Sequence, residues 1–266
     1  MFKLLRILIS NKNFLFFIFL EIVSFVLIIK SHDYAQTKTH DWQTAVAGFF
    51  DRQIYAINSH FYLKKYNDSL LKQNAQLIQA LLQKKYNDKT PVLPGQFKVK
   101  PAYVLTNQYT FDHNTLIINK GRKDSIIPEM GVVTNNGVVG VIQKTSGHFS
   151  RVISVLNKSS KINVALKNTN YSGFLAWTGE DPNYFEVIDM PVNANLKRGD
   201  TLVTGGMSNY FPRGLLVGKI IDFKTVPGRK SYVIQMKTFA DMTNLGPVYV
   251  LKNNYKAELD SLKLKQ

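Results

Sequence analysis

The chain has 266 residues, 45% of them hydrophobic, which is enough to bury one large core or two small ones. It contains no cysteine, and this excludes disulfides, thiol catalysis and cysteine-based metal sites. The net charge of +16 comes from dispersed pairs of bases, such as Lys64–Lys65 and Lys197–Arg198, and not from one block interleaved with aromatics. Nucleic-acid binding is therefore disfavoured. Such a surface suits acidic lipid head groups or an acidic partner, although for any single pair a solvated surface is the simpler interpretation.

Residues 14–29, FLFFIFLEIVSFVLII, are predicted to form a transmembrane helix. The helix would cover about 24 Å of a hydrocarbon core about 30 Å thick, and Lys12 and Lys30 can extend their ammonium groups to water. Its Leu, Ile, Phe and Val residues each contribute roughly −0.3 to −0.6 kcal/mol to insertion, which outweighs about +3 kcal/mol for Glu21. A signal peptide would need a small-residue cleavage site, which the following KSHDYAQTK lacks. A buried soluble helix is the other alternative, disfavoured because the segment has almost no polar face.

Glu21 and Ser24 are the two polar residues of this segment, and a spacing of three places them on one helix face. Carboxylates inside membranes usually face protein. We therefore expect this face to contact another membrane helix, from a second copy or from a polytopic partner. The alternative is that a protonated Glu21 is simply tolerated by the bilayer.

The orientation of the chain follows from the bases that flank the apolar segment. More bases precede it than closely follow it, which places a short tail of residues 1–13 in the cytoplasm and the rest of the chain outside it. No second apolar run approaches spanning length, so a single-pass protein is predicted. The flanking bases are Lys3, Arg6 and Lys12 before the segment, and Lys30 and Lys38 after it.

Residues 30–90 are interpreted as a juxtamembrane segment and a coiled coil, helical from about 41 to 87. Leucines recur every seven residues at one heptad position, and two asparagines occupy successive a positions, where they select register and a parallel pair. The alternative is an amphipathic helix packed on its own domain, but a helix of this length would span roughly 70 Å. The residues expected to mediate self-association are Leu63, Asn67, Leu70, Asn74, Leu77 and Leu81.

Residues 97–252 are predicted to be all-β, because a dozen short β-branched runs alternate there with Gly, Asn and Pro turns. Asn136–Gly137 predicts a hairpin with a type I′ turn, and Gly140 in the following strand predicts a bulge or a close backbone approach. The polar tail of residues 253–266 is expected to be peripheral.

The densest motif in the chain is RGDTLVTGGMSNYFPRGLLVGKI, from Arg198 to Ile220. No Gly-Lys-Ser/Thr follows its glycines, so it is not a P-loop, and a fold-defining loop is the favoured interpretation. The motif nevertheless resembles the G-D-x-V-x-T-S-G…F-P-x-G…G stretch of the rod shape-determining protein MreC family, with Gly205 in place of the usual Ser. The G-V-V-G stretch from Gly137 to Gly140 is also similar, as is SVLNKSSKINV, in which Asn157–Lys158 replaces Asp-Pro. The matching motif residues are Gly199, Asp200, Thr204, Gly206, Phe211, Pro212, Gly214 and Gly218.

The resemblance covers nearly the whole chain and implies two small β-barrel-like subdomains after the coiled coil. It implies a non-enzymatic, self-associating periplasmic scaffold, held in the inner membrane, that organises or activates peptidoglycan synthases in the cell-elongation complex (the elongasome). The partners that it implies are a second copy, inner-membrane lipid, MreD, MreB filaments, RodA and an elongation-specific penicillin-binding transpeptidase. From the charge pattern and the lack of cysteine and paired histidine, no nucleic acid, cofactor or metal is expected.

Two other classes of protein were considered. Ser69 and Lys72 match the S-x-x-K of penicillin-binding enzymes, but they lie in the predicted coil and no S-D-N or K-T-G follows. The five histidines show no close pairing suited to zinc, so no catalytic residue is predicted. A periplasmic adaptor of an export system also combines one span, a coil and β domains. Such adaptors usually carry a coiled-coil hairpin, and here no returning helix follows the outgoing one.

Overall fold

The computed structural model describes residues 12–31, 63–83, 93, 95–167, 169–225, 228 and 230–263. The chain divides into two compact units, residues 1–67 and residues 68–266. The first contains helix α2 (Lys12–Ser31), on which Glu21 and Ser24 are exposed. Within the described ranges, no helix is at once long enough and apolar enough to cross a membrane. The anchor at 14–29 therefore stays a prediction.

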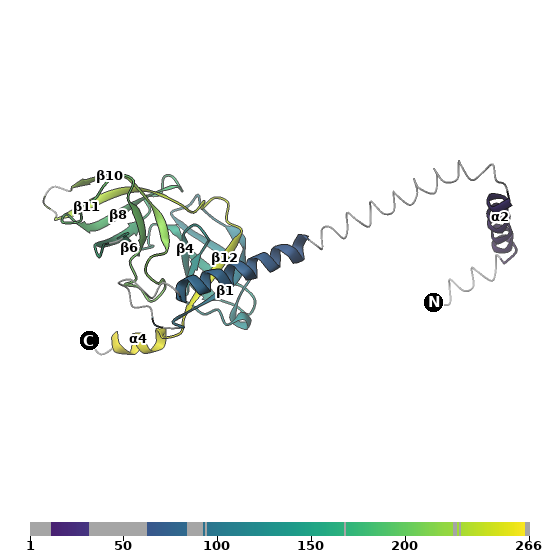
Figure 1. Cartoon of the computed structure of the whole chain (residues 1–266), viewed down its shortest axis with the longest axis horizontal. Helices are drawn as coiled ribbons and strands as arrows, with labels where there is room; N and C mark the ends of the chain where they lie inside the picture. The colour runs from purple at the N-terminus through teal and green to yellow at the C-terminus, as the bar shows by residue number, and fades with distance from the viewer. Residues whose placement is uncertain are drawn as a thin grey trace. The chain divides into compact units, whose positions relative to one another are not determined.

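The second unit contains two closed antiparallel β-barrels of six strands each, shown in teal to yellow in Figure 1. Barrel 1 has the strand order β1-β12-β3-β4-β5-β2 and barrel 2 the order β10-β11-β8-β7-β6-β9. Barrel 1 consists of β1 (Phe97–Asn107), β2 (His113–Ile118), β3 (Gly131–Val133), β4 (Val138–Thr145), β5 (Ser150–Asn157) and β12 (Pro247–Asn253). Barrel 2 consists of β6 (Ile162–Leu166), β7 (Ser172–Ala176), β8 (Tyr184–Pro191), β9 (Thr201–Thr204), β10 (Leu216–Thr225) and β11 (Ser231–Thr238).

The two barrels are nested in the sequence. Barrel 2 lies between β5 and β12, and β12 then returns to pair with β1 on one side and with β3 on the other. Closure leaves neither barrel with an unpaired strand edge. The twelve predicted strands and the two barrel-like subdomains are thus confirmed.

Each barrel is filled by the inward row of its strands. In β2 and β8 buried residues alternate with more exposed ones, the period that a strand half-covered by a core requires. Barrel 1 encloses Leu116, Ile118, Val132, Val152 and Val250, and barrel 2 encloses Phe185, Val187, Leu202, Ile234 and Met236, all of them at most 2% exposed.

The predicted β3–β4 hairpin is present, but its turn is not type I′. That turn needs positive φ at both central residues, and neither Asn136 nor Gly137 has one. Instead the Thr134 hydroxyl accepts hydrogen bonds from the backbone N–H of both residues, at 3.2 and 3.1 Å. This side-chain turn needs no left-handed residue. The lack of a side chain at Gly137 instead avoids a close contact, because a Cβ there would lie 3.2 Å from the Cβ of Ala240.

The close approach predicted at Gly140 is confirmed, because a Cβ on this residue would lie 2.0 Å from the carbonyl oxygen of Ile153 on β5. The helix expected at 41–87 is described for residues 63–83 only, and the remainder lies outside the described residues. The polar tail contains a helix that was not expected, α4 (Lys256–Lys263). Its Lys256 forms ion pairs of 2.6 Å with Asp260 on the next turn and with Glu129 of barrel 1.

Candidate protein-interaction site

The helix of residues 68–83 is packed on barrel 1 by one face. Leu71, Ala75 and Leu82 on this face are 5–9% exposed. Burying each leucine contributes about 1.5–3 kcal/mol. Gln79 fixes the register, because its side-chain amide donates to the Phe97 carbonyl at 2.6 Å and accepts from the Val99 N–H at 2.8 Å. The alternative to the coiled coil, an amphipathic helix packed on the chain's own domain, therefore describes one face of this helix.

A second face of the same helix carries the predicted self-association leucines. Leu70 is 38% exposed, and Leu77 and Leu81 are 62% and 66% exposed. Successive residues of an α-helix are rotated by about 100° around its axis. Leu70 and its buried neighbour Leu71 therefore lie on different faces. In the first unit, Leu63 is 60% exposed and Asn67 is also exposed. We call Leu70, Leu77 and Leu81 the leucine stripe.

Asn74 lies between these two faces and bonds to the chain's own domain. It is half-buried, and its side chain is hydrogen-bonded to the hydroxyl of Tyr249 on β12, as is the side chain of Asn135. Burial raises the pKa of Tyr249, and these two hydrogen bonds act in the opposite direction. Asn74 thus has a local structural role beside the one predicted for it in a coiled-coil seam.

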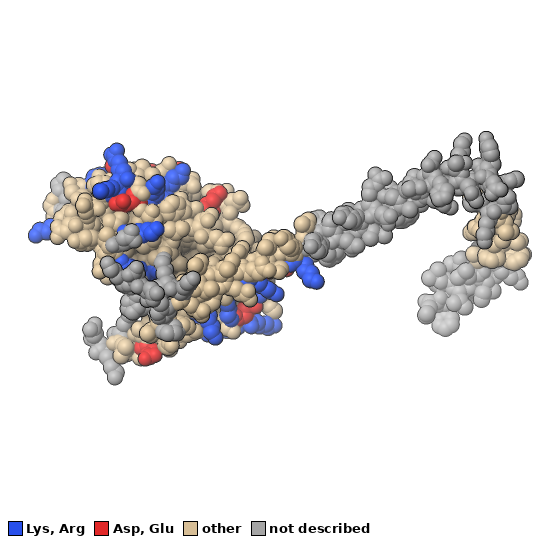
Figure 2. All heavy atoms as spheres, viewed as in Figure 1, with Lys and Arg blue, Asp and Glu red and all other residues tan. Residues whose placement is uncertain are grey.

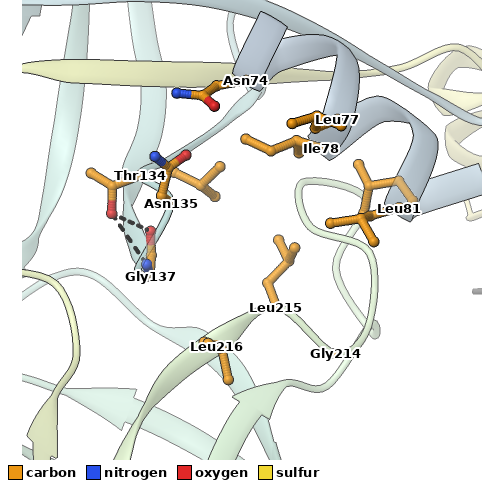
Figure 3. A pocket seen from close by; sticks show the side chains of 12 residues that line it. Asn74, Leu77, Ile78, Leu81, Thr134, Asn135, Gly137, Gly214, Leu215 and Leu216 are labelled. Carbon is orange, nitrogen blue, oxygen red and sulfur yellow. Dashed lines mark hydrogen bonds between the residues drawn. The ribbon is translucent and has the colours of Figure 1, made fainter. Parts of the chain in front are cut away.

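An apolar groove with a cavity volume of about 590 Å³ lies beside this packed face, between the helix and the two barrels (Figure 3). Three walls define it: the helix, the β3–β4 turn of barrel 1 and the end of the loop before β10 in barrel 2. Leu77 and Leu81 border it from the helix, and Leu216, which is 42% exposed, borders it from barrel 2. The lining residues are Asn74, Leu77, Ile78, Leu81, Leu82, Val133, Thr134, Asn135, Gly137, Gly214, Leu215 and Leu216.

The motif that runs from 199 to 218 builds the barrel 2 wall of this groove. Thr204 organises its loop: its backbone bonds to Gly214 and Leu215, and its hydroxyl donates to the Pro212 carbonyl at 2.5 Å and accepts from the Leu215 N–H at 3.0 Å. Gly206 and Gly214 have φ values of +81° and +89°, which only glycine adopts without strain. The motif is therefore a rigid loop that presents the leucines at its end.

Two other motif residues set the turn that precedes this loop. Gly199 has φ of +91° and donates its N–H to the Ile220 carbonyl at 2.8 Å. The Asp200 carboxylate accepts the Lys197 N–H at 2.8 Å and so closes the turn into β9. Gly218 on β10 leaves no room for a side chain, because a Cβ would lie 2.1 Å from the Cε of Met236.

Phe211 joins the two barrels. It is 1% exposed although it lies in a loop of barrel 2, and a Cβ on Gly131 of β3 would lie 2.5 Å from its ring. Next to it, the Asn253 side chain donates to the Asn209 carbonyl at 3.2 Å, and Asn209 donates to Asp260 of α4 at 2.8 Å. The loop that walls the groove is thus held against barrel 1, and the walls do not depend on barrel 2 alone.

Within the described ranges, no three His, Cys, Asp or Glu side chains are grouped so that they could hold a metal ion. The groove itself is lined by apolar side chains, amides and one hydroxyl. Such a lining suits apolar side chains of a protein partner and provides no acid, base or nucleophile pair for catalysis.

A family model, "Rod shape-determining protein MreC, barrel core", matches residues 104–252. The chain belongs to the MreC family. It is 28% identical to the cell shape-determining protein MreC of Listeria monocytogenes over 159 residues, which are 59% of this chain and 54% of that protein. It is 24% identical to the MreC of Haemophilus influenzae over 208 residues, 76% of this chain and 58% of that protein. The chain thus spans little more than half the length of these curated relatives.

Solved structures of MreC share the fold. A structure of the Listeria monocytogenes MreC superposes with a TM-score of 0.57 at 22% identity, covering 72% of this chain and 94% of that one. The crystal structure of MreC from Pseudomonas aeruginosa superposes with a TM-score of 0.53 at 22% identity, covering 57% and 98%.

In this chain, two sets of residues that were predicted separately meet in one groove. Asn74, Leu77 and Leu81 come from the predicted coil, and Gly137 and Gly214 come from the two family motifs. Glu21 and Ser24 on α2 belong to the other compact unit.

The sequence reasoning missed Thr134, Asn135, Leu215 and Leu216, all of which line the groove. The Leu-Leu pair directly after the motif glycine at 214 was the available signal. Gly205, which departs from the usual MreC motif, is explained by its surroundings: a Cβ there would lie 1.9 Å from the side-chain oxygen of Asn163.

Proposed function

We propose that this chain is a non-enzymatic scaffold of the bacterial cell-elongation complex. In this proposal residues 14–29 anchor it in the inner membrane with the N-terminus in the cytoplasm, and the two barrels lie in the periplasm. It organises or activates peptidoglycan synthases and so maintains cell shape. The observation that carries the proposal is the groove, because a rigid body with an apolar groove beside an exposed leucine stripe suits protein contacts.

Two copies pair through the leucine stripe in this proposal. The three leucines of the stripe are roughly half exposed in one copy. Burying six of them across a dimer would contribute on the order of 5–9 kcal/mol. Association costs about 4–15 kcal/mol in lost freedom. This stretch alone therefore supports a weak, concentration-dependent dimer.

The groove receives an apolar segment of a wall-synthesis enzyme, for which the elongation-specific penicillin-binding transpeptidase is the candidate. MreD, RodA and cytoplasmic MreB are further partners in the same complex, with MreD a candidate for the Glu21/Ser24 face. These partners follow from membership of the MreC family. The groove indicates which kind of contact a partner would make, namely an apolar contact that depends on a fit of shapes.

A photo-crosslinking amino acid at Leu216 tests the groove in living cells. Leu216 lines the groove, whereas Ile221 on the same strand is equally exposed, at 40%, and does not line it. We expect the probe at 216 to capture a penicillin-binding transpeptidase and the probe at 221 not to do so. Capture of an export-system component at 216 would favour the adaptor alternative and contradict the scaffold.

Single cysteines test the pairing without background, because the native chain has none. Leu70→Cys or Leu77→Cys is expected to form a disulfide-linked dimer on oxidation. Lys72→Cys, which lies opposite the stripe on the helix, serves as the matched control. Depletion of the protein is expected to round a rod-shaped cell and disperse wall synthesis, whereas unchanged rods with failed export would refute the proposal.

A further inference from the structure

One end of barrel 1 is unusually basic. Eight bases lie on four strands, β1, β4, β5 and β12, and on the loop before β3, and Figure 2 shows Lys and Arg side chains gathered beneath the helix of residues 68–83. We call these eight residues the basic end. They are Lys98, Lys100, Lys120, Arg122, Lys123, Lys144, Arg151 and Lys252.

Three of these lysines continue the inward rows of their strands. Lys98 and Lys100 lie in the same row as buried Ala102 on β1, and Lys252 lies in the same row as buried Val250 on β12. These lysines lie beyond the buried core, where the same rows continue to one end of the barrel. Lys98 and Lys252 are paired directly across the two strands, an arrangement that is destabilising for like charges.

Lys100 connects this group to the loop before β3. Its ammonium donates a hydrogen bond to the Asp124 carbonyl. The pKa of Lys100 is lowered, first by burial and then by Lys252, with smaller contributions from other lysines, including Lys120, while Asp124 opposes the change. The short helix η2 (Arg122–Asp124) therefore covers the end of the barrel and adds its own bases to it.

The remaining bases lie at the end of β4 and the start of β5, next to the turn that joins these strands. The N–H groups of Arg122 and Lys123 donate to the carbonyls of Ser146 and Gly147, at 2.8 and 3.0 Å, which ties η2 to this turn. Lys144 and Arg151 on either side of the turn form a second directly opposed pair of like charges.

Acids do not balance these charges. Among the described residues of barrel 1, Asp112 is paired with Lys158 at 2.8 Å and Glu129 with Lys256 at 2.6 Å, both outside the basic end. Asp124 is the one acid within it, so eight bases against one acid leave a net charge of +7.

Exposed apolar side chains lie among these bases. Phe149 at the tip of the β4–β5 turn is 50% exposed, and Ile127 just after η2 is 46% exposed. The two segments are in contact, since a Cβ on Gly121 would lie 2.7 Å from the Phe149 nitrogen. Bases flanking exposed aromatic and aliphatic tips are the pattern of surfaces that rest on anionic membranes.

We propose that the basic end of barrel 1 docks on an anionic lipid bilayer, with its bases at the head groups and Phe149 and Ile127 at the interface. Lys120 is paired with Asp124 at 2.8 Å. The other long lysines match a diffuse negative surface, because their flexible stems adjust to many head-group positions. Two opposed like-charge pairs become favourable when anionic lipids surround them. The proposal goes beyond a scaffold role and does not depend on it.

The test places one cysteine, His148→Cys, in the full-length chain and labels it with an environment-sensitive dye. The native chain has no cysteine, and this site leaves Phe149 intact. The protein is reconstituted into vesicles of neutral lipid or of neutral lipid with 30% phosphatidylglycerol as the lipid probe. We expect a blue-shifted emission with the anionic vesicles only, and its loss at about 1 M salt, where the screening length falls to about 3 Å.

A charge-matched pair of variants completes the test. Lys98→Gln with Lys252→Gln is expected to reduce the docked fraction relative to the free one about 25-fold, at about fivefold per base. Lys219→Gln with Lys237→Gln removes an equally opposed pair from β10 and β11 of barrel 2 and is expected to leave docking unchanged. Circular dichroism verifies that both variants are folded.

Three outcomes would overturn the proposal. The first is equal emission in neutral and anionic vesicles. The second is an equal shift for a dye at Ile221→Cys on barrel 2, which would indicate non-specific adsorption. The third is a response to soluble polyglutamate but not to anionic vesicles, which would assign the basic end to an acidic protein.

Discussion

Replacing Phe211 by Ala tests whether the family motif joins the two barrels. The ring is 1% exposed and is packed directly on the backbone of Gly131. Because this glycine is held in a strand, the surroundings cannot close over the missing ring, and the loss is expected at about 3–5 kcal/mol. For a domain of this size each kcal/mol lowers Tm by about 2–4 °C, so the decrease is about 6–20 °C.

Scanning calorimetry of the full-length protein is the assay, with Phe174→Ala as the matched control. Phe174 lies on barrel 2 but is 38% exposed, so its truncation is expected to have a much smaller effect. We expect Phe211→Ala also to broaden or split the transition, because the barrels lose their shared core residue. A decrease in Tm no larger than that of the control would refute the reasoning.

A double-mutant cycle sharpens the same prediction. Gly131→Ala alone places a Cβ 2.5 Å from the Phe211 ring and 2.4 Å from the Tyr210 carbonyl oxygen. The first clash disappears when the ring is removed and the second does not. The cost of Gly131→Ala should therefore be smaller, though not zero, in the Phe211→Ala background, with a coupling of about 0.5–3 kcal/mol. Strict additivity would show that the ring does not rest on Gly131.

Three further predictions concern single residues. Gly140→Ala should lower the urea midpoint markedly, because its Cβ would lie 2.0 Å from the Ile153 carbonyl oxygen, whereas Gly147→Ala, with nothing within 4 Å, should leave the midpoint unchanged. Thr204→Val should cost about 1–3 kcal/mol in chemical unfolding by leaving the partners of its hydroxyl unpaired, and Thr204→Ser should restore most of this. The pKa of Asp124 is lowered, foremost by the hydrogen bond from Lys120. The ionised carboxylate therefore stabilises the fold fully above its unfolded pKa of about 3.9. This stabilisation is lost as the pH falls through the lower pKa of the folded state. Asp124→Asn should therefore be less stable than the native chain at pH 7 and approach it in strongly acidic buffer; a pH-independent difference in Tm would contradict this.

The strands could be predicted from the sequence because each is a short β-branched run between turn residues, and all twelve were found. The nesting of the barrels could not, because pairing β1 with β12 joins residues about 150 positions apart and no local pattern encodes that choice. The type I′ turn was wrongly predicted because Asn136–Gly137 alone indicates it, whereas the hydroxyl of Thr134 decides the geometry. Helix α4 was missed because its Lys256 depends on Glu129, far away in the sequence.

The candidate site was predicted in its parts and not as a whole. The heptad spacing identified Leu77 and Leu81, and the family motif identified Gly214, but their meeting in one groove depends on Phe211 and Gln79, which hold loop and helix on barrel 1. The helix also has one face packed on barrel 1 and one exposed face that carries the leucines. A single heptad pattern shows one of them, so the face buried on the chain's own domain was treated as an alternative when both exist.

The nested order of the strands has a consequence for biosynthesis. Barrel 2 is complete once residue 238 has been made, whereas barrel 1 keeps two open edges, on β1 and β3, until β12 emerges at residues 247–253. Translation that stops between residues 238 and 247 would release a chain with one closed barrel and one open sheet, whose unpaired edge strands can pair with other chains. Strand β12 therefore closes barrel 1, and nonsense codons or proteolysis before residue 253 should yield aggregates in place of shortened, working protein.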